Sequence, residues 1–193
     1  MGKIIVSENV SLDGVGQDPT GDEGFRAGGW FGKIDKRDHD AWAEAELDEA
    51  LGAEALLLGR RTYEFFAARW PSRTGRWADR LNNLPKHVVS ATLHDPKWTN
   101  TTVLTGDPLR DVTALRPKVN GDIVVYGSFR LVHALVEHDL VDELRLMVFP
   151  FVLGAGDRPF GDTGGTKRLR LIDIGTVGNG LVRLSYAAPR PGR

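Results

Sequence analysis

Two patterns of hydrophobic and polar positions alternate along most of the chain. Short apolar runs of strand length are each followed by a segment in which apolar residues recur at helical spacing. The segments that we expect to form strands are KIIV (3–6), ALLL (55–58), KHVVSATL (86–93), TTVLTG (101–106), DIVVYG (122–127) and VDELRLMVFPFV (141–152). Strands that alternate with helices predict a mostly parallel sheet covered by helices on both faces.

The helical segments show two patterns. In residues 38–53, the apolar side chains of Ala43, Leu47, Ala50 and Leu51 recur at helical spacing, and we interpret the many acids between them as a solvated face. In residues 107–119, Asp107 followed by proline predicts a capped helix start.

The C-terminal part of the chain has a different pattern. Residues 167–189 alternate as two strands joined through Gly178-Asn179-Gly180, which predicts a hairpin that adds antiparallel strands to the sheet. A glycine-rich loop near residues 11–34 is long enough to suggest a functional role. We therefore expect one α/β domain over residues 1–189 and a tail at residues 190–193.

Composition excludes several classes of function. Lys and Arg number 25 against 26 Asp and Glu, so no overall field attracts nucleic acid or an anionic membrane. Without cysteine there are no disulfides, thiolate nucleophiles or cysteine metal sites, and the five histidines form no HxxxH pair, so we expect no metal. The N-terminus lacks a secretory pattern and no apolar run approaches the roughly 20 residues of a membrane helix, so we expect a cytoplasmic protein.

Two junctions combine an apolar strand, a glycine and a helix. The first has Gly59, Arg60, Arg61 and Thr62, and the second has Gly127-Ser128. In parallel sheets ligands bind where the strands end, and the free amides of a first helical turn favour an anion. Neither junction is a P-loop or a GxGxxG fingerprint. Together they predict a binding site for a diphosphate that spans both junctions. The alternatives are that the glycines are ordinary turn residues and that the arginines form a solvated helix face.

Four motifs in order give a resemblance to a known family. VSLDGVG (10–16), LLLGRRTYE (56–64), VVSATL (88–93) and VVYGSFRLVHALVEHDLVDELRLMVFPFVLGAGDRPF (124–160) resemble the dihydrofolate reductase superfamily. Within it they are most similar to the branch that contains the reductase domain of bifunctional riboflavin-biosynthesis proteins. The resemblance implies a dihydrofolate-reductase-like fold of three layers and NADPH as the cofactor.

The resemblance also implies cofactor-binding residues. It places Gly59, Arg60 and Thr62 by the pyrophosphate and the adenosine 2′-phosphate, and Ser90 by the adenosine. The backbone of Gly127, Ser128 and Phe129 would contact the pyrophosphate near the nicotinamide. Many relatives carry a basic residue where this chain has Ala91, so Arg60 and Arg61 are left to distinguish NADPH from NADH.

For the reaction, the cofactor supplies the hydride and the protein needs a proton donor. We rank Asp13 first, with a plain Asp-Gly turn as the alternative. In dihydrofolate reductase a carboxylate on the first helix binds the pterin, and here Asp40 matches only in rough position. We expect Asn9, Tyr126 and Trp30 to line the substrate pocket, with Trp30 and Phe31 as a lid or, alternatively, as a plug on the core.

We therefore expect an NADPH-dependent reductase that acts on a small molecule, similar to 5-amino-6-(5-phosphoribosylamino)uracil reductase of riboflavin biosynthesis. A dihydrofolate or pterin reductase is one alternative, and a nucleotide-binding module without catalysis is another. In each case we expect a homodimer, with the apolar segment LRLMVFPFV (144–152) pairing across the interface.

Overall fold

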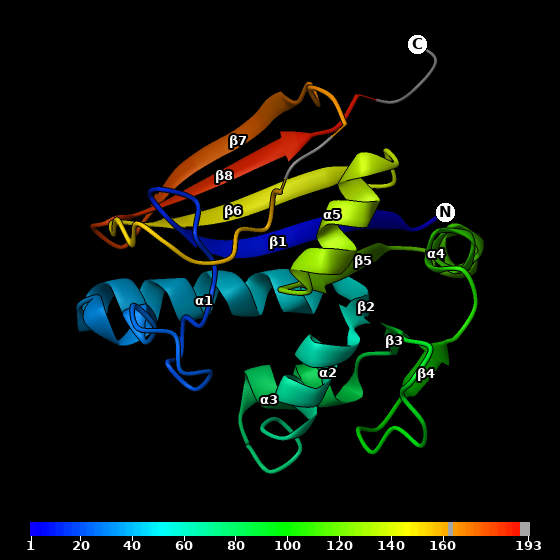
Figure 1. Ribbon diagram of the computed structural model, residues 1–193. Helices are drawn as coiled ribbons and strands as arrows, with labels where there is room; N and C mark the ends of the chain where they lie inside the picture. Colours follow the sequence, from blue (N-terminus) through cyan, green and yellow to red (C-terminus); the bar gives the residue numbers. More distant parts are fainter. Residues whose placement is uncertain (162–163, 190–193) are drawn as a thin grey trace.

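The computed structural model describes residues 1–161 and 164–189, and a single eight-stranded sheet runs through this part of the chain (Figure 1). The expected tail at residues 190–193 lies outside the described residues. The strands are β1 (Lys3–Ser11), β2 (Ala53–Gly59), β3 (Lys86–Val89), β4 (Thr101–Leu104), β5 (Asp122–Tyr126), β6 (Glu143–Phe149), β7 (Arg170–Val177) and β8 (Leu181–Ala187).

The order of the strands is β4-β3-β2-β5-β1-β6-β8-β7. The six strands from β4 to β6 are parallel to their neighbours, whereas β8 runs antiparallel to β6 and β7 antiparallel to β8. The predicted α/β fold with a mostly parallel sheet and a C-terminal antiparallel hairpin is therefore confirmed, and residues 178–180 form the turn of that hairpin.

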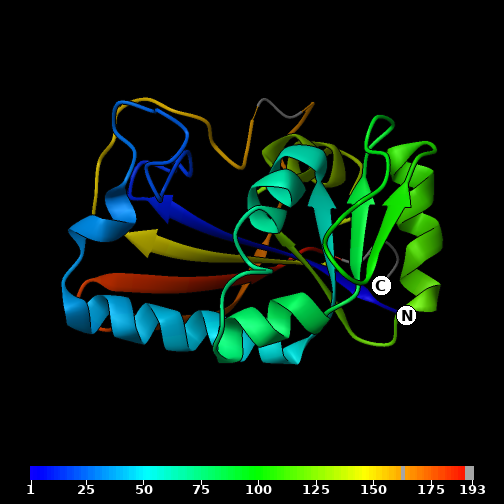
Figure 2. The same cartoon turned by 90° about the horizontal axis from the view of Figure 1, so that it is seen from below.

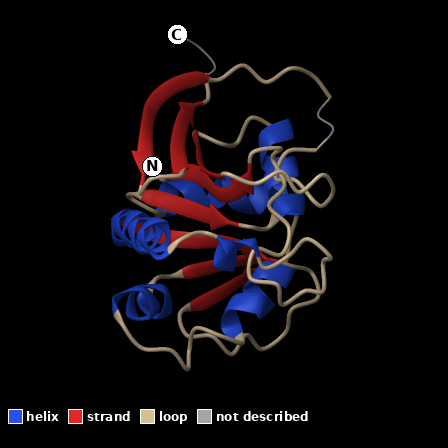
Figure 3. Ribbon diagram, turned by 90° about the vertical axis from the view of Figure 1, so that its left-hand side faces the viewer, coloured by secondary structure: helices blue, strands red, loops and turns tan. Residues whose placement is uncertain are grey.

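Helices cover both faces of the sheet (Figure 3). They are α1 (Lys36–Gly52), α2 (Arg60–Ala67), α3 (Arg76–Asn83), α4 (Pro108–Leu115) and α5 (Phe129–Glu137), with short 3-10 turns η1 (Trp30–Lys33) and η2 (Arg116–Lys118). Helices α4 and α5 pack through Val112, Leu115 and Leu135 on one face. On the other face, Tyr63 of α2 and Leu81 of α3 pack with the strands. None of the helices that the structure describes is long and apolar enough to cross a membrane.

The two helix starts that carry aspartate are capped as side-chain chemistry predicts. The Asp107 carboxylate accepts a hydrogen bond from the backbone N–H of Arg110 at 2.9 Å, and Pro108 occupies the first turn. The Asp35 carboxylate accepts from the N–H of Asp38 at 2.8 Å in the same way. Each cap satisfies one amide that the helix itself leaves without a partner.

Three expectations about the elements need correction. Helix α3 was not predicted, because its eight residues carry few apolar side chains. Strand β1 is longer than expected and continues to Ser11. Residues 144–149 belong to β6, which pairs with β1 on one side and β8 on the other. Their backbone is therefore used inside the sheet, so the expected pairing of LRLMVFPFV across a dimer interface cannot occur by strand addition to β6.

Candidate functional site

The two strand-to-helix junctions lie against each other, because β2 and β5 are neighbours in the sheet. The backbone N–H of Gly59 donates a hydrogen bond to Ser128 Oγ at 2.9 Å. The backbone N–H of Ser128 donates to Thr62 Oγ1, also at 2.9 Å. The start of α2 and the start of α5 are thus joined into one structural unit at the carboxyl edge of the sheet, which is where ligands bind in parallel sheets.

The backbone of the second junction has an unusual conformation. Gly127 and Ser128 are consecutive residues with positive φ angles of 54° and 59°. A side chain at residue 127 would strain the backbone, because its φ angle is positive. It would also crowd Thr62, because a Cβ atom there would lie 3.3 Å from Thr62 Oγ1. The Ser128 hydroxyl also donates to the Tyr126 carbonyl at 3.1 Å, which helps to hold a serine in this region. Glycine is therefore required at residue 127 for two physical reasons.

Neither of the two helix starts has a side-chain cap. Their first-turn amides keep the partial positive charge that favours an anion. Arg60 adds charge at the start of α2; its guanidinium is 47% exposed and pairs with Glu64 one turn further along the helix, at 3.1 Å. Arg61 is exposed. The Phe129 side chain packs close to Gly16, in the loop that follows β1.

Ser90 follows the end of β3, further along the same edge of the sheet. Its hydroxyl accepts hydrogen bonds from the backbone N–H groups of Thr92 and Leu93, at 3.2 and 3.0 Å. In this structure Ser90 therefore stabilises the turn after β3, and the next residue, Ala91, is exposed.

Asp13 has the environment of a structural turn residue. Its carboxylate accepts from Ser11 Oγ at 2.7 Å and from the backbone N–H groups of Leu153 and Gly154 at 3.0 and 2.9 Å. These bonds join the loop after β1 to the loop after β6, which lie together in Figure 2. The hydrogen bond from Leu153, followed by that from Ser11, lowers the pKa of Asp13 to about 2. These bonds favour the charged form of Asp13 and support the alternative of a turn residue, and the catalytic role of Asp13 stays a prediction.

Trp30 belongs to the core. Its side chain is 0% exposed and packs edge-on against Phe149, with ring centroids 5.0 Å apart. Its indole N–H donates to the carbonyl of Gln17 at 3.0 Å, and Phe31 stacks on the same Phe149 ring. Trp30 and Phe31 therefore pack against the core, as the alternative interpretation expected, and they do not form a lid over a substrate.

The inward face of α1 agrees only in part with the one that the sequence predicted, since Ala50 is buried and Leu47 partly buried. Ala43 and Leu51 are exposed, whereas Trp42, Glu46 and Glu49 face the sheet and are only partly accessible. These three residues are spaced by four and three positions, which places them on one side of the helix. The interpretation of the acids on this helix as a solvated face is therefore wrong for Glu46 and Glu49, although it holds for other acids on the helix, such as Asp40 and Glu44, which are exposed.

Glu46 is held in a setting that favours its neutral form. Burial, and next the charge of Glu49, raise the pKa of Glu46 to about 8, while Asn9 and Trp42 lower it. The Trp42 indole N–H donates to Asn9 Oδ1 at 2.8 Å, which fixes the amide beside the carboxyl. The predicted pocket residue Asn9 thus lies against an acid that keeps its proton at neutral pH.

Glu8 and Tyr126 extend this group of polar side chains to the junction. Glu8 is 5% exposed, and its Oε2 accepts from the backbone N–H of Gly127 at 3.1 Å. Burial is the main cause that raises the pKa of Glu8 well above its usual value. The pKa of Tyr126 is likewise raised by burial and by the charges of Glu49 and Glu46. Within the described part of the chain, Glu8 Oε1, Glu49 Oε1 and the Tyr126 hydroxyl are buried without a hydrogen-bond partner.

A single arginine balances part of this negative charge. Arg145 of β6 donates to Glu143 Oε1 at 2.7 Å and to Glu49 Oε2 at 3.1 Å. A small cavity of about 20 Å³ is lined in part by Ser7, Glu46, Glu49 and Arg145. Among residues 1–161 and 164–189, no cluster of His, Cys, Asp and Glu side chains could hold a metal ion.

Sequence reasoning missed Glu8, Glu46 and Glu49. The burial of Glu46 and Glu49 could have been inferred from their spacing from Trp42. A tryptophan on a helix rich in charged residues indicates which side of the helix is buried, and both acids lie on that side. Glu8 interrupts a strand of buried residues, and a charge at such a position indicates either a partner or a function.

The sequence matches the family described as the RibD C-terminal domain over residues 2–183. It is also 26% identical over 139 residues to the uncharacterized protein YyaP of Bacillus subtilis (strain 168), across 69% of this chain and 73% of that protein.

Solved structures share the fold. A protein named for riboflavin biosynthesis from Shewanella sp. PV-4 has a TM-score of 0.76 and 19% identity, covering 97% of this chain and 99% of that chain. A dihydrofolate reductase from Enterococcus faecalis, complexed with NADP(H) and RAB-propyl, has a TM-score of 0.60 and 14% identity, covering 98% of both chains. The dihydrofolate-reductase-like fold expected from the motifs is thus confirmed.

Proposed function

This chain belongs to the RibD C-terminal domain family, and from that premise we propose that it is a reductase that takes a hydride from NADPH. The observation that carries the proposal is the joined pair of uncapped helix starts at Gly59 and Gly127-Ser128. Two adjacent first turns of this kind fit the two phosphates of a dinucleotide better than a single phosphate.

The residues present fit the cofactor. Gly127 leaves open the space that a side chain would fill beside Thr62, and the amides of both first turns favour a diphosphate. Arg60 and Arg61 are exposed at the start of α2, where their forked donors suit the 2′-phosphate that distinguishes NADPH from NADH. The Arg60–Glu64 pair is exposed, and pairs of that kind are worth only about 0–1 kcal/mol, so Arg60 remains available. When bound, NADPH supplies the hydride.

We assign the proton that accompanies the hydride to Glu46, in place of Asp13. With a pKa of about 8, Glu46 carries a proton at neutral pH and can act as a general acid. Asn9 and Trp42 orient its carboxyl, and Tyr126 is buried close to the same acids. Asn9 and Tyr126 keep their proposed places in the substrate pocket.

The substrate that we propose is a small heterocycle or sugar phosphate with a reducible C=O or C=N group. The resemblance to riboflavin-pathway reductases supports 5-amino-6-(5-phosphoribosylamino)uracil. A buried carboxyl on the first helix, Glu46, favours dihydrofolate or a related pterin as the second candidate, because the resemblance of the motifs to dihydrofolate reductase implies a pterin-binding acid on that helix.

Turnover tests the proposal. The purified protein is mixed with NADPH and each candidate substrate, and the loss of reduced nicotinamide absorbance is followed. We expect oxidation of NADPH with one substrate, slower oxidation of NADH, and a drop in kcat of about a hundredfold or more in Glu46→Gln, as for loss of a general acid. Arg60→Ala should reduce the preference for NADPH. Binding of NADPH with no oxidation in the presence of any candidate would instead favour a nucleotide-binding module without catalysis.

A further inference from the structure

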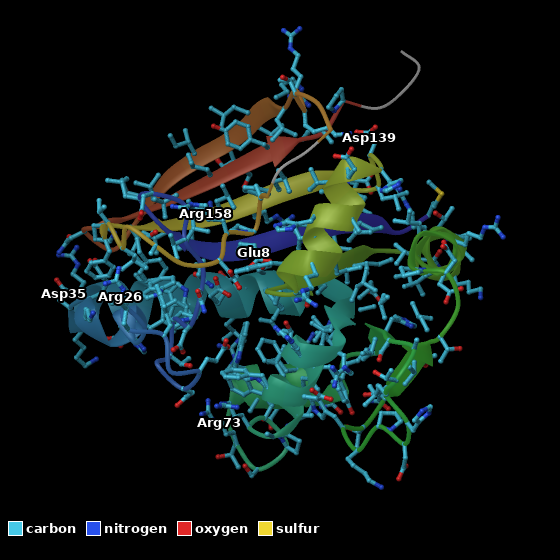
Figure 4. The ribbon with its side chains drawn as sticks, in the orientation of Figure 1. Glu8, Arg26, Asp35, Arg73, Asp139 and Arg158 are labelled. Atoms are coloured by element: carbon cyan, nitrogen blue, oxygen red, sulfur yellow. The ribbon has the colours of Figure 1, made fainter. Side chains whose placement is uncertain are left out.

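A carboxyl is enclosed beneath the β5–α5 junction. Glu8 projects from β1 with 5% exposure, and its Oε2 accepts the backbone N–H of Gly127 at 3.1 Å. Figure 4 labels Glu8 at β1, near the centre of the molecule. Its other oxygen, Oε1, is buried and has no hydrogen-bond partner among the residues that the structure describes. A buried polar atom of this kind calls for a physical explanation.

The bond from Glu8 helps to set the shape of the junction. Gly127 and Ser128 are two consecutive residues with positive φ angles, and each amide is held by a side chain from another element. The Gly127 N–H is held by Glu8 of β1, and the Ser128 N–H by Thr62 of α2. With these two amides occupied, the free amides of the first turn of α5 are left to face a ligand.

The charges around Glu8 favour its neutral form. Burial is the largest cause that raises the pKa of Glu8, the hydrogen bond from Gly127 lowers it, and Glu46 and Glu49 of α1 raise it further. From β5, Tyr126 faces the same acids. The nearby cation from β6, Arg145, is already paired with Glu49 and Glu143.

We propose that Glu8 positions the backbone of Gly127 and Ser128 for the diphosphate of NADPH, and that the protein binds this diphosphate only while the Glu8 carboxyl carries a proton. The inference rests on the proposed use of NADPH. An ionised carboxylate buried behind the junction would repel the bound diphosphate, because Coulomb interactions are strong where water is excluded. By linkage, cofactor binding then favours protonation of Glu8, and protonation favours binding.

The proposal predicts a pH profile for binding. Affinity for NADPH falls as the pH rises past the point at which Glu8 ionises in the free protein, by up to about tenfold per pH unit for one coupled proton. The dissociation constant is measured by tryptophan fluorescence from about pH 7, where the 2′-phosphate with its second pKa near 6 is already mostly ionised, to about pH 10.

Three variants make the test specific. Glu8→Gln keeps an oxygen that can accept the Gly127 N–H but cannot ionise, so its affinity should stay level across the range. Glu8→Ala removes the bond and should bind NADPH at least tenfold more weakly at pH 7. Glu44→Gln removes the same charge from an exposed position on α1 and should keep the wild-type profile.

Several results would overturn the proposal. A level profile for the wild-type protein, or the same slope in Glu8→Gln, would remove the role of the Glu8 proton. A slope that is lost in Glu46→Gln but kept in Glu8→Gln would assign the titration to Glu46. Wild-type affinity in Glu8→Ala would show that the bond to Gly127 positions nothing of importance. Lack of NADPH binding at every pH would contradict the proposed function itself. This outcome differs from those above, in which NADPH binds but Glu8 has no role.

Discussion

At the scale of single residues, the surroundings of a carboxyl decide whether it holds a proton at neutral pH. Asp13 and Glu46 both lie near the carboxyl edge of the sheet, yet their pKa values move in opposite directions. Backbone N–H groups and Ser11 stabilise the charged form of Asp13 and lower its pKa to about 2. Burial beside Glu49 destabilises the charged form of Glu46 and raises its pKa to about 8. Residue type alone does not distinguish these cases, so the sequence could not show which of the two acids holds a proton.

The raised pKa of Glu46 predicts how stability depends on pH. Below its ordinary pKa of 4.5, Glu46 is protonated in both the folded and the unfolded chain. As the pH rises toward about 8, the unfolded chain releases the proton while the folded chain keeps it, so this contribution to stability is progressively lost. Thermal unfolding followed by circular dichroism should therefore show a Tm that falls between pH 5 and pH 8 (values approximate).

Glu46→Gln should reduce this fall in Tm without abolishing it, because Glu8 also has a raised pKa and contributes in the same direction. Glu44→Gln, at an exposed position of the same helix, is the control and should leave the profile as in the wild-type protein. If the Tm of Glu46→Gln followed the wild-type profile at every pH, Glu46 would be ionised in the folded protein and could not be the proton donor.

Asp13 should behave as a structural residue. Asp13→Asn weakens the bonds to Leu153 and Gly154, so the Tm at neutral pH should fall while the reductase rate stays close to that of the wild-type protein. The stabilisation by a carboxylate with a lowered pKa is present above pH 3.8 and is lost as the pH falls through about 2, so the difference in Tm should narrow in acid. A large loss of rate with an unchanged Tm would restore Asp13 as a catalytic candidate.

At the scale of elements, the tip of the C-terminal hairpin is attached to the start of α1. The Asp38 carboxylate is 6% exposed and accepts the backbone N–H groups of Asn179 and Gly180, at 2.5 and 3.3 Å. Asn179 and Gly180 are 141 and 142 residues from Asp38 in the sequence, so this contact holds the β7–β8 turn against the start of α1. Its loss leaves two part-buried amides without this partner, which is costly.

Asp38→Ala should therefore lower the free energy of unfolding by about 1–3 kcal/mol, measured by urea denaturation. Asp40→Ala is the matched control, since Asp40 is exposed and pairs only with Lys36 on the same helix. The control should change stability by less than about 0.5 kcal/mol. Equal effects of the two substitutions would show that the contact with the hairpin contributes little.

The elements also show what could be predicted from the sequence. The parallel strands, the hairpin at Gly178-Asn179-Gly180 and the capped start of α4 follow from local patterns, and all are present. The burial of Glu46 and Glu49 does not follow, because the pattern of α1 offered Ala43 and Leu51 as an alternative inward face. Helix amphipathicity is a weak guide where the buried side of a helix carries acids, because such a helix departs from the ordinary pattern.

At the scale of the whole molecule, one edge of the sheet is open and apolar. Strand β7 lies at the end of the strand order, next to β8 alone. Leu171, Ile172 and Ile174 on this strand are 46%, 42% and 62% exposed. An edge strand offers unpaired backbone groups, and contiguous exposed apolar side chains mark interaction surfaces. We therefore propose that the expected homodimer forms through β7, in place of the segment in β6.

Light scattering coupled to size-exclusion chromatography tests this arrangement. The wild-type protein should have twice the mass of one chain, and Ile174→Glu should reduce the mass to that of a monomer. Leu51→Glu, which introduces the same charge at an exposed leucine of α1, should leave the dimer intact. A monomeric wild-type protein would contradict the homodimer, and a dimer that survives Ile174→Glu would exclude β7 as its interface.

The central claim is that the joined junctions of β2–α2 and β5–α5 bind the diphosphate of NADPH. The measurement that tests it most directly is a titration of the purified protein with NADPH, followed by tryptophan fluorescence, for the wild-type protein and Gly127→Val. A side chain at residue 127 fits neither the positive φ angle nor the space beside Thr62. We predict micromolar binding by the wild-type protein and a loss of at least about tenfold in a folded Gly127→Val variant. Equal affinity in the two proteins, or no binding to either, would contradict the claim and leave the two glycines as ordinary turn residues.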